Sequence, residues 1–158
     1  MSSRTNAPDF GILLALSFRV YVDELHAELG SRGFEDLRPS FGIVVRALHE
    51  RPLTLTQLAE QMAVSKQAVA KITGEMLARG FIEQQGAEGD RRMKDLVLTA
   101  RGRALMRAAT EIGGRVEARL RREIGADAVA GMRTALEHLV VSGGGETEMR
   151  AKRSRPVW

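Results

Sequence analysis

The sequence predicts a mainly α-helical fold with one small antiparallel β-hairpin. Apolar residues recur at spacings of three and four over most of the 158 residues, which is the period of amphipathic helices. Two short β-type runs, FIEQQ and DLVLT, lie on either side of a charged segment bounded by glycines, as in a hairpin. Capping residues and glycines between the helical segments mark where single helices begin and end.

The composition excludes several chemistries. The chain has no cysteine, which removes disulfides, thiolate catalysis, cysteine redox sensing and cysteine-ligated zinc. The three histidines are not accompanied by other ligands at the spacing of a metal site, so we expect no metal and no cofactor. Lys and Arg number 24 against 20 Asp and Glu, and this net charge of +4 slightly favours an anionic partner.

We expect neither a signal peptide nor a membrane span in the N-terminal residues. MSSRTNAPDF has no long apolar core behind its arginine. The apolar run FGILLALSFRVYV is interrupted by Ser17 and Arg19 and is too short to cross a bilayer. We therefore expect a cytoplasmic protein with no membrane partner.

The first predicted helix follows a polar tail, residues 1–8, that we expect to be disordered. Asp9 is its expected N-cap, and Gly30 with Gly33 forms its expected end. Its apolar residues are Phe10, Leu13, Leu14, Phe18, Tyr21, Leu25 and Leu29. They cover more than one face, which indicates burial against several neighbours or against another subunit.

A second helix is predicted in LRPSFGIVVRALHERP, with Ser40 as N-cap and Pro52 just beyond its end. Two shorter helices follow. Thr54 and Gln57 match a capping box at the start of the first, which ends near residues 63–64. Ser65 begins the second helix, and Gly80 ends it. The connection between the two is so short that they form a helix-turn-helix, and the hairpin that follows has the place of a wing.

Two long helices complete the chain. Thr99 caps the first, which runs from Ala100 to about Ile124 with an apolar stripe at spacings of three and four. Gly113 and Gly114 predict a bend or a close helix contact, since each costs about 1 kcal/mol relative to alanine. Gly125 separates the final helix, and residues 143–158 form a basic tail that we expect to be disordered.

The second helix of the helix-turn-helix is suited to double-stranded DNA. A helix that enters the major groove has polar and basic residues in its first turns, opposite its core face. Ser65 and the backbone N–H groups beside it can hold a phosphate. Gln67 can read adenine, and Lys71 can reach guanine or phosphate. The predicted DNA-binding residues on the helices are Thr54, Ser65, Lys66, Gln67, Ala68, Ala70 and Lys71.

The charged tip of the wing supplies the remaining predicted DNA contacts, which are Asp90, Arg91, Arg92 and Lys94. We expect Asp90 to hold an arginine or a backbone N–H while a neighbouring arginine enters the narrow minor groove, where A·T-rich DNA is most negative. Arg92 is slightly favoured for the groove, and the choice between Arg91 and Arg92 stays open.

These residues together resemble the MarR family of bacterial transcriptional regulators. The resemblance depends on LTLTQLA at residues 53–59, Ser65, Val69, LARGF at 77–81, DRR at 90–92 and LTARG at 98–102, and it covers roughly residues 10 to 142. Many family members have Thr or Ser where this chain has Ala68 and Ala70, so the family does not imply an operator sequence. Without cysteine, the oxidant sensing of one family branch is excluded.

The resemblance implies a homodimer in which residues 9–36 and 100–142 form dimerisation helices and residues 37–99 form the winged DNA-binding domain. Two such domains would bind successive major grooves of a palindromic operator. The apolar surface of the terminal helices independently favours symmetric association, since one short chain cannot cover it. The implied function is transcription regulation, with repression as the expected mode.

Family members often bind a small aromatic or phenolic effector between the dimer helices and the DNA-binding part. The residues expected to line such a site here are Tyr21, His26, Phe41, Val45, His49 and Met106, and plain core packing is the alternative for each. A histidine there could bind an effector carboxylate or phenol.

There are two alternatives to DNA-binding regulation. A winged-helix protein-interaction module without specific DNA readout is the main alternative, and the basic exposed face argues against it. An enzyme is disfavoured because the sequence has no nucleophile–base arrangement, no phosphate-binding glycine loop and no metal signature.

Overall fold

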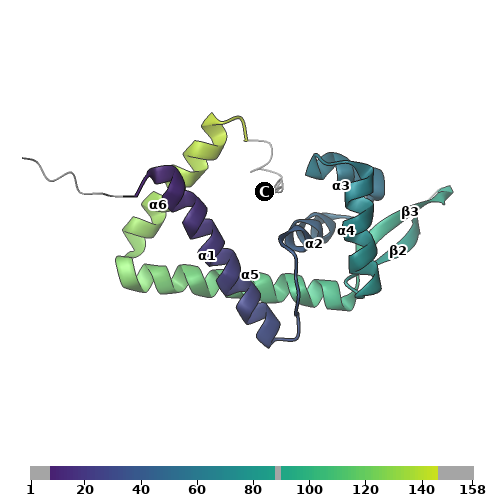
Figure 1. Ribbon diagram of the computed structural model, residues 1–158, viewed down its shortest axis with the longest axis horizontal. Coiled ribbons are helices and arrows are strands. Elements are labelled where there is room, and N and C mark those ends of the chain that lie inside the picture. The colour runs from purple at the N-terminus through teal and green to yellow at the C-terminus, as the bar shows by residue number, and fades with distance from the viewer. Residues whose placement is uncertain (1–7, 88–89, 146–158) are drawn as a thin grey trace, which may run out of the picture. The chain divides into compact units, whose positions relative to one another are not determined.

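The structure is a computed structural model that describes residues 8–87 and 90–145, with the backbone alone described at residues 87 and 90–93. The chain forms two compact units, Met1–Asp36 and Leu37–Trp158. The second unit contains the helix-turn-helix, the wing and both C-terminal helices (Figure 1).

The first unit consists of one long helix, α1 (Phe10–Ser31). Asp9 caps it as predicted, because its Oδ1 accepts hydrogen bonds from the N–H groups of Gly11 (2.9 Å) and Ile12 (3.3 Å). Gly33 has the positive φ of 84° expected where a chain leaves a helix, whereas Gly30 lies inside the helix. Leu29 is the buried residue of α1, and its exposed large apolar side chains are Phe10, Ile12, Leu13, Leu16, Phe18, Val20 and Tyr21.

The second unit begins with α2 (Pro39–Glu50), whose start differs from the prediction. Arg38, not Ser40, is the N-cap residue, and no side chain caps the helix. The reason is Pro39 at the first helical position, where its fixed φ suits the helix and its missing N–H costs nothing. Ser40 is therefore already helical.

The helix-turn-helix consists of α3 (Leu55–Met62) and α4 (Lys66–Ala78). The wing follows as β2 (Ile82–Ala87) and β3 (Asp90–Leu98), and β1 (Leu53–Thr54) adds a third strand to the sheet. The strand order is β1-β3-β2, with antiparallel pairs throughout. Strand β1 was not predicted, since two residues are too few to show alternation.

The core of the second unit lies where α2, α3, α4 and the base of the wing meet. Its fully buried side chains come from each of these elements and from α5, and they include Phe41, Val44, Leu53, Leu58, Val69, Met76, Phe81 and Ile112. This core fixes the helix-turn-helix and the wing as one body, because apolar burial of this kind is the main force that holds a small domain together.

The C-terminal helices are α5 (Ala100–Ile124) and α6 (Ala126–Ser142), and α5 runs from the wing at one end to α6 at the other (Figure 1). Thr99 caps α5 as predicted, with its Oγ1 accepting from the Gly102 N–H at 3.1 Å. The helix is unbroken through Gly113 and Gly114. A Cβ added at Gly114 would meet no atom within 4 Å, so the structure shows no close helix contact at this glycine.

The turn from α5 to α6 is braced by Glu117. Its carboxylate accepts hydrogen bonds from Arg121 (2.8 Å), one turn further along α5, and from Arg133 (2.7 Å) on α6. The hydrogen bond from Arg121, and then the hydrogen bond and charge of Arg133, lower the pKa of the Glu117 carboxyl.

Candidate nucleic-acid interface

The two helices of the helix-turn-helix begin at side-chain caps that the sequence predicted. At α3, Thr54 Oγ1 accepts from the Gln57 N–H at 3.2 Å, and Gln57 Oε1 accepts from the Thr54 N–H at 2.9 Å. This reciprocal pair is a complete capping box. At α4, Ser65 Oγ accepts from the Ala68 N–H at 3.1 Å.

The turn between the two helices is tight because Ala63 ends α3 in the left-handed conformation, with φ 54° and ψ 41°. Its N–H returns to the carbonyls of α3, so the chain reverses over a few residues before Ser65 begins α4. The start of α4 is thereby presented at the surface.

Helix α4 has two distinct faces. Val69, Thr73 and Met76 are buried, and the Thr73 hydroxyl donates to the Val69 carbonyl at 2.9 Å. On the opposite face and in the first turns, all the predicted contact residues of this helix are exposed: Ser65, Lys66, Gln67, Ala68, Ala70 and Lys71. Thr54 is half-buried at the start of α3. The first N–H groups of a helix have no partner within it, so this end also suits an anion.

The wing places its charged residues on β3. Lys94 is exposed and lies opposite Gly86 of β2. Beyond this pair the register shifts, so that Ala87 lies opposite Asp90. Such irregularities change the direction of neighbouring side chains. The backbone of Asp90, Arg91 and Arg92 lies on β3, but their side chains lie outside the described part of the structure.

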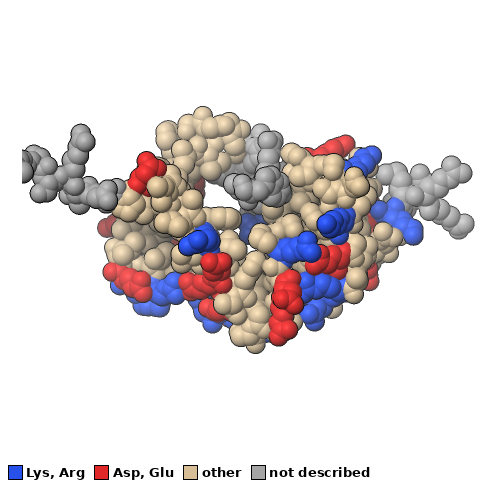
Figure 2. Space-filling view, viewed as in Figure 1, with Lys and Arg blue, Asp and Glu red and all other residues tan. Residues whose placement is uncertain are grey.

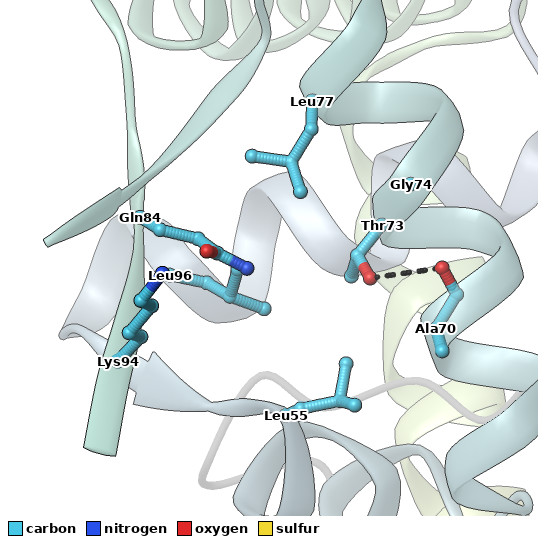
Figure 3. A pocket seen from close by; sticks show the side chains of 8 residues that line it. All are labelled: Leu55, Ala70, Thr73, Gly74, Leu77, Gln84, Lys94 and Leu96. Carbon is cyan, nitrogen blue, oxygen red and sulfur yellow. Dashed lines mark hydrogen bonds between the residues drawn. The ribbon is translucent and has the colours of Figure 1, made fainter. Parts of the chain in front are cut away.

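A shallow groove of about 180 Å³ separates α4 from the wing (Figure 3). It is lined by Leu55, Ala70, Thr73, Gly74, Leu77, Gln84, Lys94 and Leu96. Helix α4 contributes mainly small and apolar residues, and the strands contribute Gln84, Lys94 and Leu96. Two of the predicted DNA-binding residues, Ala70 on α4 and Lys94 on β3, therefore line opposite sides of this groove.

The residues predicted to bind an effector lie in both units. Tyr21 (exposed) and His26 (half-buried) are on α1 of the first unit. In the second unit, Phe41 and Val45 are buried in the core, His49 is exposed at the end of α2, and Met106 is half-buried on α5. None of these residues lines the groove beside α4. A common effector site formed by them stays a prediction.

Charges of both signs share the surface. Figure 2 shows Lys and Arg side chains interspersed with Asp and Glu across the face in view. An anionic partner would therefore be recognised there by individual side chains at defined positions rather than by a broad positive field. Within residues 8–87 and 90–145, no helix is long and apolar enough to cross a membrane. No cluster of three or more potential metal ligands occurs among the described side chains.

One cluster beside the interface was not predicted. Arg79, at the end of α4, lies over the rings of Phe41 and Phe81, and Glu75 joins it to Arg38. The only signal in the sequence was the i, i+4 spacing of Glu75 and Arg79, which is common on solvated helices. The aromatic partners come from other elements and could not be read from that spacing.

The comparison of sequences with known proteins identifies the winged segment. Residues 37–93 match the family model described as "MarR family". The HTH-type transcriptional regulator PetP from Rhodobacter capsulatus is 34% identical over 100 residues, which cover 60% of this chain and 60% of PetP. The alignment thus leaves a substantial part of PetP unmatched.

Solved structures share the fold over a longer stretch. The reduced form of MarR from E. coli matches with a TM-score of 0.69 at 18% identity, covering 84% of this chain and 97% of MarR. Streptococcus pneumoniae FabT, solved in complex with DNA, matches with a TM-score of 0.65 at 21% identity, covering 83% of this chain and 94% of FabT. At these identities the likeness concerns the fold. Over residues 37–93 the sequence of this chain is therefore similar to the MarR family, and over most of its length the chain has the winged helix-turn-helix fold of these solved structures.

Proposed function

We propose that this protein is a sequence-specific, double-stranded-DNA-binding transcription regulator. The observation that carries the proposal is the exposed face of α4. Its first turns present Lys66, Gln67 and Lys71 beside two alanines, while the opposite face is fixed in the core. This is the distribution that a helix needs to enter the major groove with its backbone close to the bases.

The MarR family supports this proposal. MarR proteins are transcription regulators and not enzymes, PetP is named as one, and FabT was solved with DNA bound. In this chain the wing extends beside α4, with Lys94 exposed on β3. We propose that Thr54, Ser65 and Lys94 contact phosphates, and that Arg91 or Arg92 reaches the minor groove.

The proposed active form is a homodimer on a palindromic operator. Large apolar side chains are exposed on α1, and more of them are exposed near and on α6: Ile124, Met132, Leu136, Leu139, Val140 and Val141. Apolar surface on this scale is unfavourable in water and is typical of an obligate subunit interface. Two symmetric copies would present two α4 helices to half-sites about one DNA turn apart.

We further propose that the protein is a cytoplasmic repressor that a small aromatic or phenolic effector releases from DNA. Tyr21, His26, Phe41, Val45, His49 and Met106 are the residues proposed for that site. The supporting observation is limited to α1 and α5, where Tyr21, His26 and Met106 keep part of their surface exposed. Release of the bound operator by the effector, at unchanged salt, is the measurement for this part of the proposal.

Binding of the purified full chain to duplexes from its own upstream region tests the proposed function. We expect specific binding that weakens steeply as salt rises, since phosphate contacts release counterions. Gln67→Ala should change which base is preferred within the site, at a cost of about 1–3 kcal/mol for the original base. Ala78→Ser, an exposed change at the far end of α4, is the matched control.

Two results would contradict the proposal. Affinity that does not respond to salt would exclude phosphate contacts. Failure to bind any duplex, together with capture of a protein partner by the exposed face of α4, would instead indicate an interaction module.

A further inference from the structure

The last turns of α4 are held by a cluster of charged and aromatic side chains that lies away from the proposed DNA-contacting face. Glu75 Oε2 is 3.0 Å from Arg38 Nε, at the start of α2. Its other oxygen, Oε1, is 3.9 Å from the guanidinium of Arg79, one turn further along α4. Glu75 thus joins the recognition helix, α4, to the helix that packs behind it.

Arg79 continues this connection into the core. The carbon of its guanidinium lies 5.4 Å from the ring centroid of Phe41 on α2 and 5.2 Å from that of Phe81, which precedes β2. Both rings are fully buried and meet edge to face, with their centroids 6.1 Å apart. Guanidinium groups at such distances are attracted to aromatic faces.

Helix α5 also contributes a residue to this cluster, Arg101. The guanidinium carbon of Arg101, in the first turn of α5, is 5.0 Å from the centroid of Phe81. The cluster therefore connects four parts of the DNA-binding unit: α2, the end of α4, the base of the wing and the start of α5. These contacts are directional, because a guanidinium is planar and a carboxylate accepts hydrogen bonds in fixed directions.

Because the cluster holds the C-terminal end of α4, a small change there would move the N-terminal end of the helix. Arg79 follows Gln67 by twelve positions, which is about 18 Å along a helix at 1.5 Å per residue. A tilt of about 10° at the Arg79 end would move Gln67 by about 3 Å. A displacement of this size equals the length of a hydrogen bond, so it would break a hydrogen bond from Gln67 to a base. The buried stripe of Val69, Thr73 and Met76 holds the helix against the core, but apolar contact is non-directional and tolerates small tilts.

We infer that Glu75 and Arg79 are positioning residues for DNA recognition: they fix the C-terminal end of α4 and thereby set where its exposed first turns meet the bases. Neither residue contacts DNA in this scheme. The inference rests on the proposed DNA-binding function, and one of its two tests does not use DNA.

The first test compares Arg79→Leu and Glu75→Gln with the unaltered chain. Affinities are measured for the duplex that the unaltered chain selects and for a shuffled duplex, at several salt concentrations. We expect the ratio of the two affinities to fall by about tenfold or more, in the range of one mismatched base pair. Affinity for the shuffled duplex and its dependence on salt should not change, since no phosphate contact is lost.

Two variants serve as controls. Glu123→Gln breaks an exposed pair of the same spacing, Arg119–Glu123 at 4.0 Å on α5, and should leave the ratio unchanged. Arg79→Lys keeps the charge beside Glu75 but lacks the planar group that lies over the rings, so it should restore only part of the ratio.

The second test is amide hydrogen exchange of the free protein. Removing the cluster should make local opening of residues 72–81 easier in both variants while α6 exchanges as before. Unchanged exchange along α4, or a uniform increase from α2 to α6, would overturn the inference. A shallower salt dependence for Arg79→Leu would overturn it too, because Arg79 would then contact phosphate directly. An unaltered chain that does not discriminate between the duplexes would contradict the proposed function, and hydrogen exchange would then show only whether Glu75 and Arg79 fix the C-terminal end of α4.

Discussion

Gly102 shows how strictly single residues can be required in this fold. It lies in the first turn of α5, and a Cβ added there would be 2.1 Å from the carbonyl oxygen of Phe81. That oxygen also accepts hydrogen bonds from the Thr99 N–H and, at 3.1 Å, from the Thr99 hydroxyl. Neither backbone segment can withdraw without breaking the junction between the wing and α5.

Gly102→Ala should therefore destabilise the protein strongly, by about 3 kcal/mol or more, at the upper end of what overpacking costs. Denaturant unfolding measures this change. Gly42→Ala is the matched control, because a Cβ there meets no atom within 4 Å and alanine is the better helix former. We expect the control to raise the free energy of unfolding by up to about 1 kcal/mol. Equal stabilities of the two variants would contradict the close approach.

The residues that the sequence identified best are those whose role is local. The caps at Asp9, Thr54, Ser65 and Thr99 depend on partners two or three positions away, and all four are confirmed. Arg79 was missed because its partners, Phe41 and Phe81, are brought to it only by the tertiary fold.

Among the elements, the wing is where the choice between Arg91 and Arg92 has to be decided by experiment. Both lie on β3, next to the change of register between Gly86 and Ala87. If Arg92 enters the minor groove, Arg92→Ala should remove the preference for A·T-rich flanks of the operator. Arg91→Ala should lower affinity equally for A·T-rich and G·C-rich flanks. Binding to operators that differ only in these flanks measures the difference, and the opposite pattern would assign the groove to Arg91.

The connection between α5 and α6 should make a contribution to stability that depends on pH. The hydrogen bond from Arg121, and then Arg133, lowers the pKa of Glu117 in the folded protein. The stabilising contribution of the ionised Glu117 is therefore fully present at pH values above the pKa of this group in the unfolded chain. The contribution is lost as pH falls through the lowered folded value.

Glu117→Gln should therefore lower the melting temperature slightly at neutral pH, and the difference from the unaltered chain should vanish in acid. Thermal unfolding across this range measures it. Glu123→Gln, on the same helix and without the link to α6, is the control. A difference that persists at acid pH would show that Glu117 acts through packing rather than through its charge.

The elements with long periodic patterns could be predicted from the sequence, whereas a very short element could not. Strand β1 has two residues, and its existence depends on pairing with Leu96 and Asp95 of β3, far along the chain. The sequence prediction for the start of α2 was wrong. Ser40 is a good N-cap residue in isolation, but Pro39 is favourable at the first helical position, so the helix begins at Pro39.

For the whole molecule, the exposed apolar side chains of α1 and α6 are the surfaces at which the proposed homodimer can be tested. Leu139 on α6 keeps 49% of its surface exposed in the single chain. If this surface is the proposed dimer interface, Leu139→Glu places a charge in it and should give monomers at micromolar concentration. Sedimentation measures the state, and Glu60→Lys, an exposed change on α3, is the control. A dimer that survives Leu139→Glu would exclude this part of α6 from the interface.

The residues of the proposed effector site are spread over the chain. They belong to both units, so they could not be predicted from the periodicity of one element. Helix α4, in contrast, lies within one unit, and so its exposed and buried faces could be predicted from periodicity alone.

The pairing of β1 with β3 limits where residues can be inserted into the hairpin. Thr54 pairs with Asp95 in the sheet, and the same residue caps α3. One extra residue between Asp95 and Leu96 would separate the two pairs that join β1 to β3, and it would displace the buried Leu96 from Leu53. It would also shift the strand end that leads into α5. Insertions should therefore be tolerated towards the tip of the hairpin and rejected at its base.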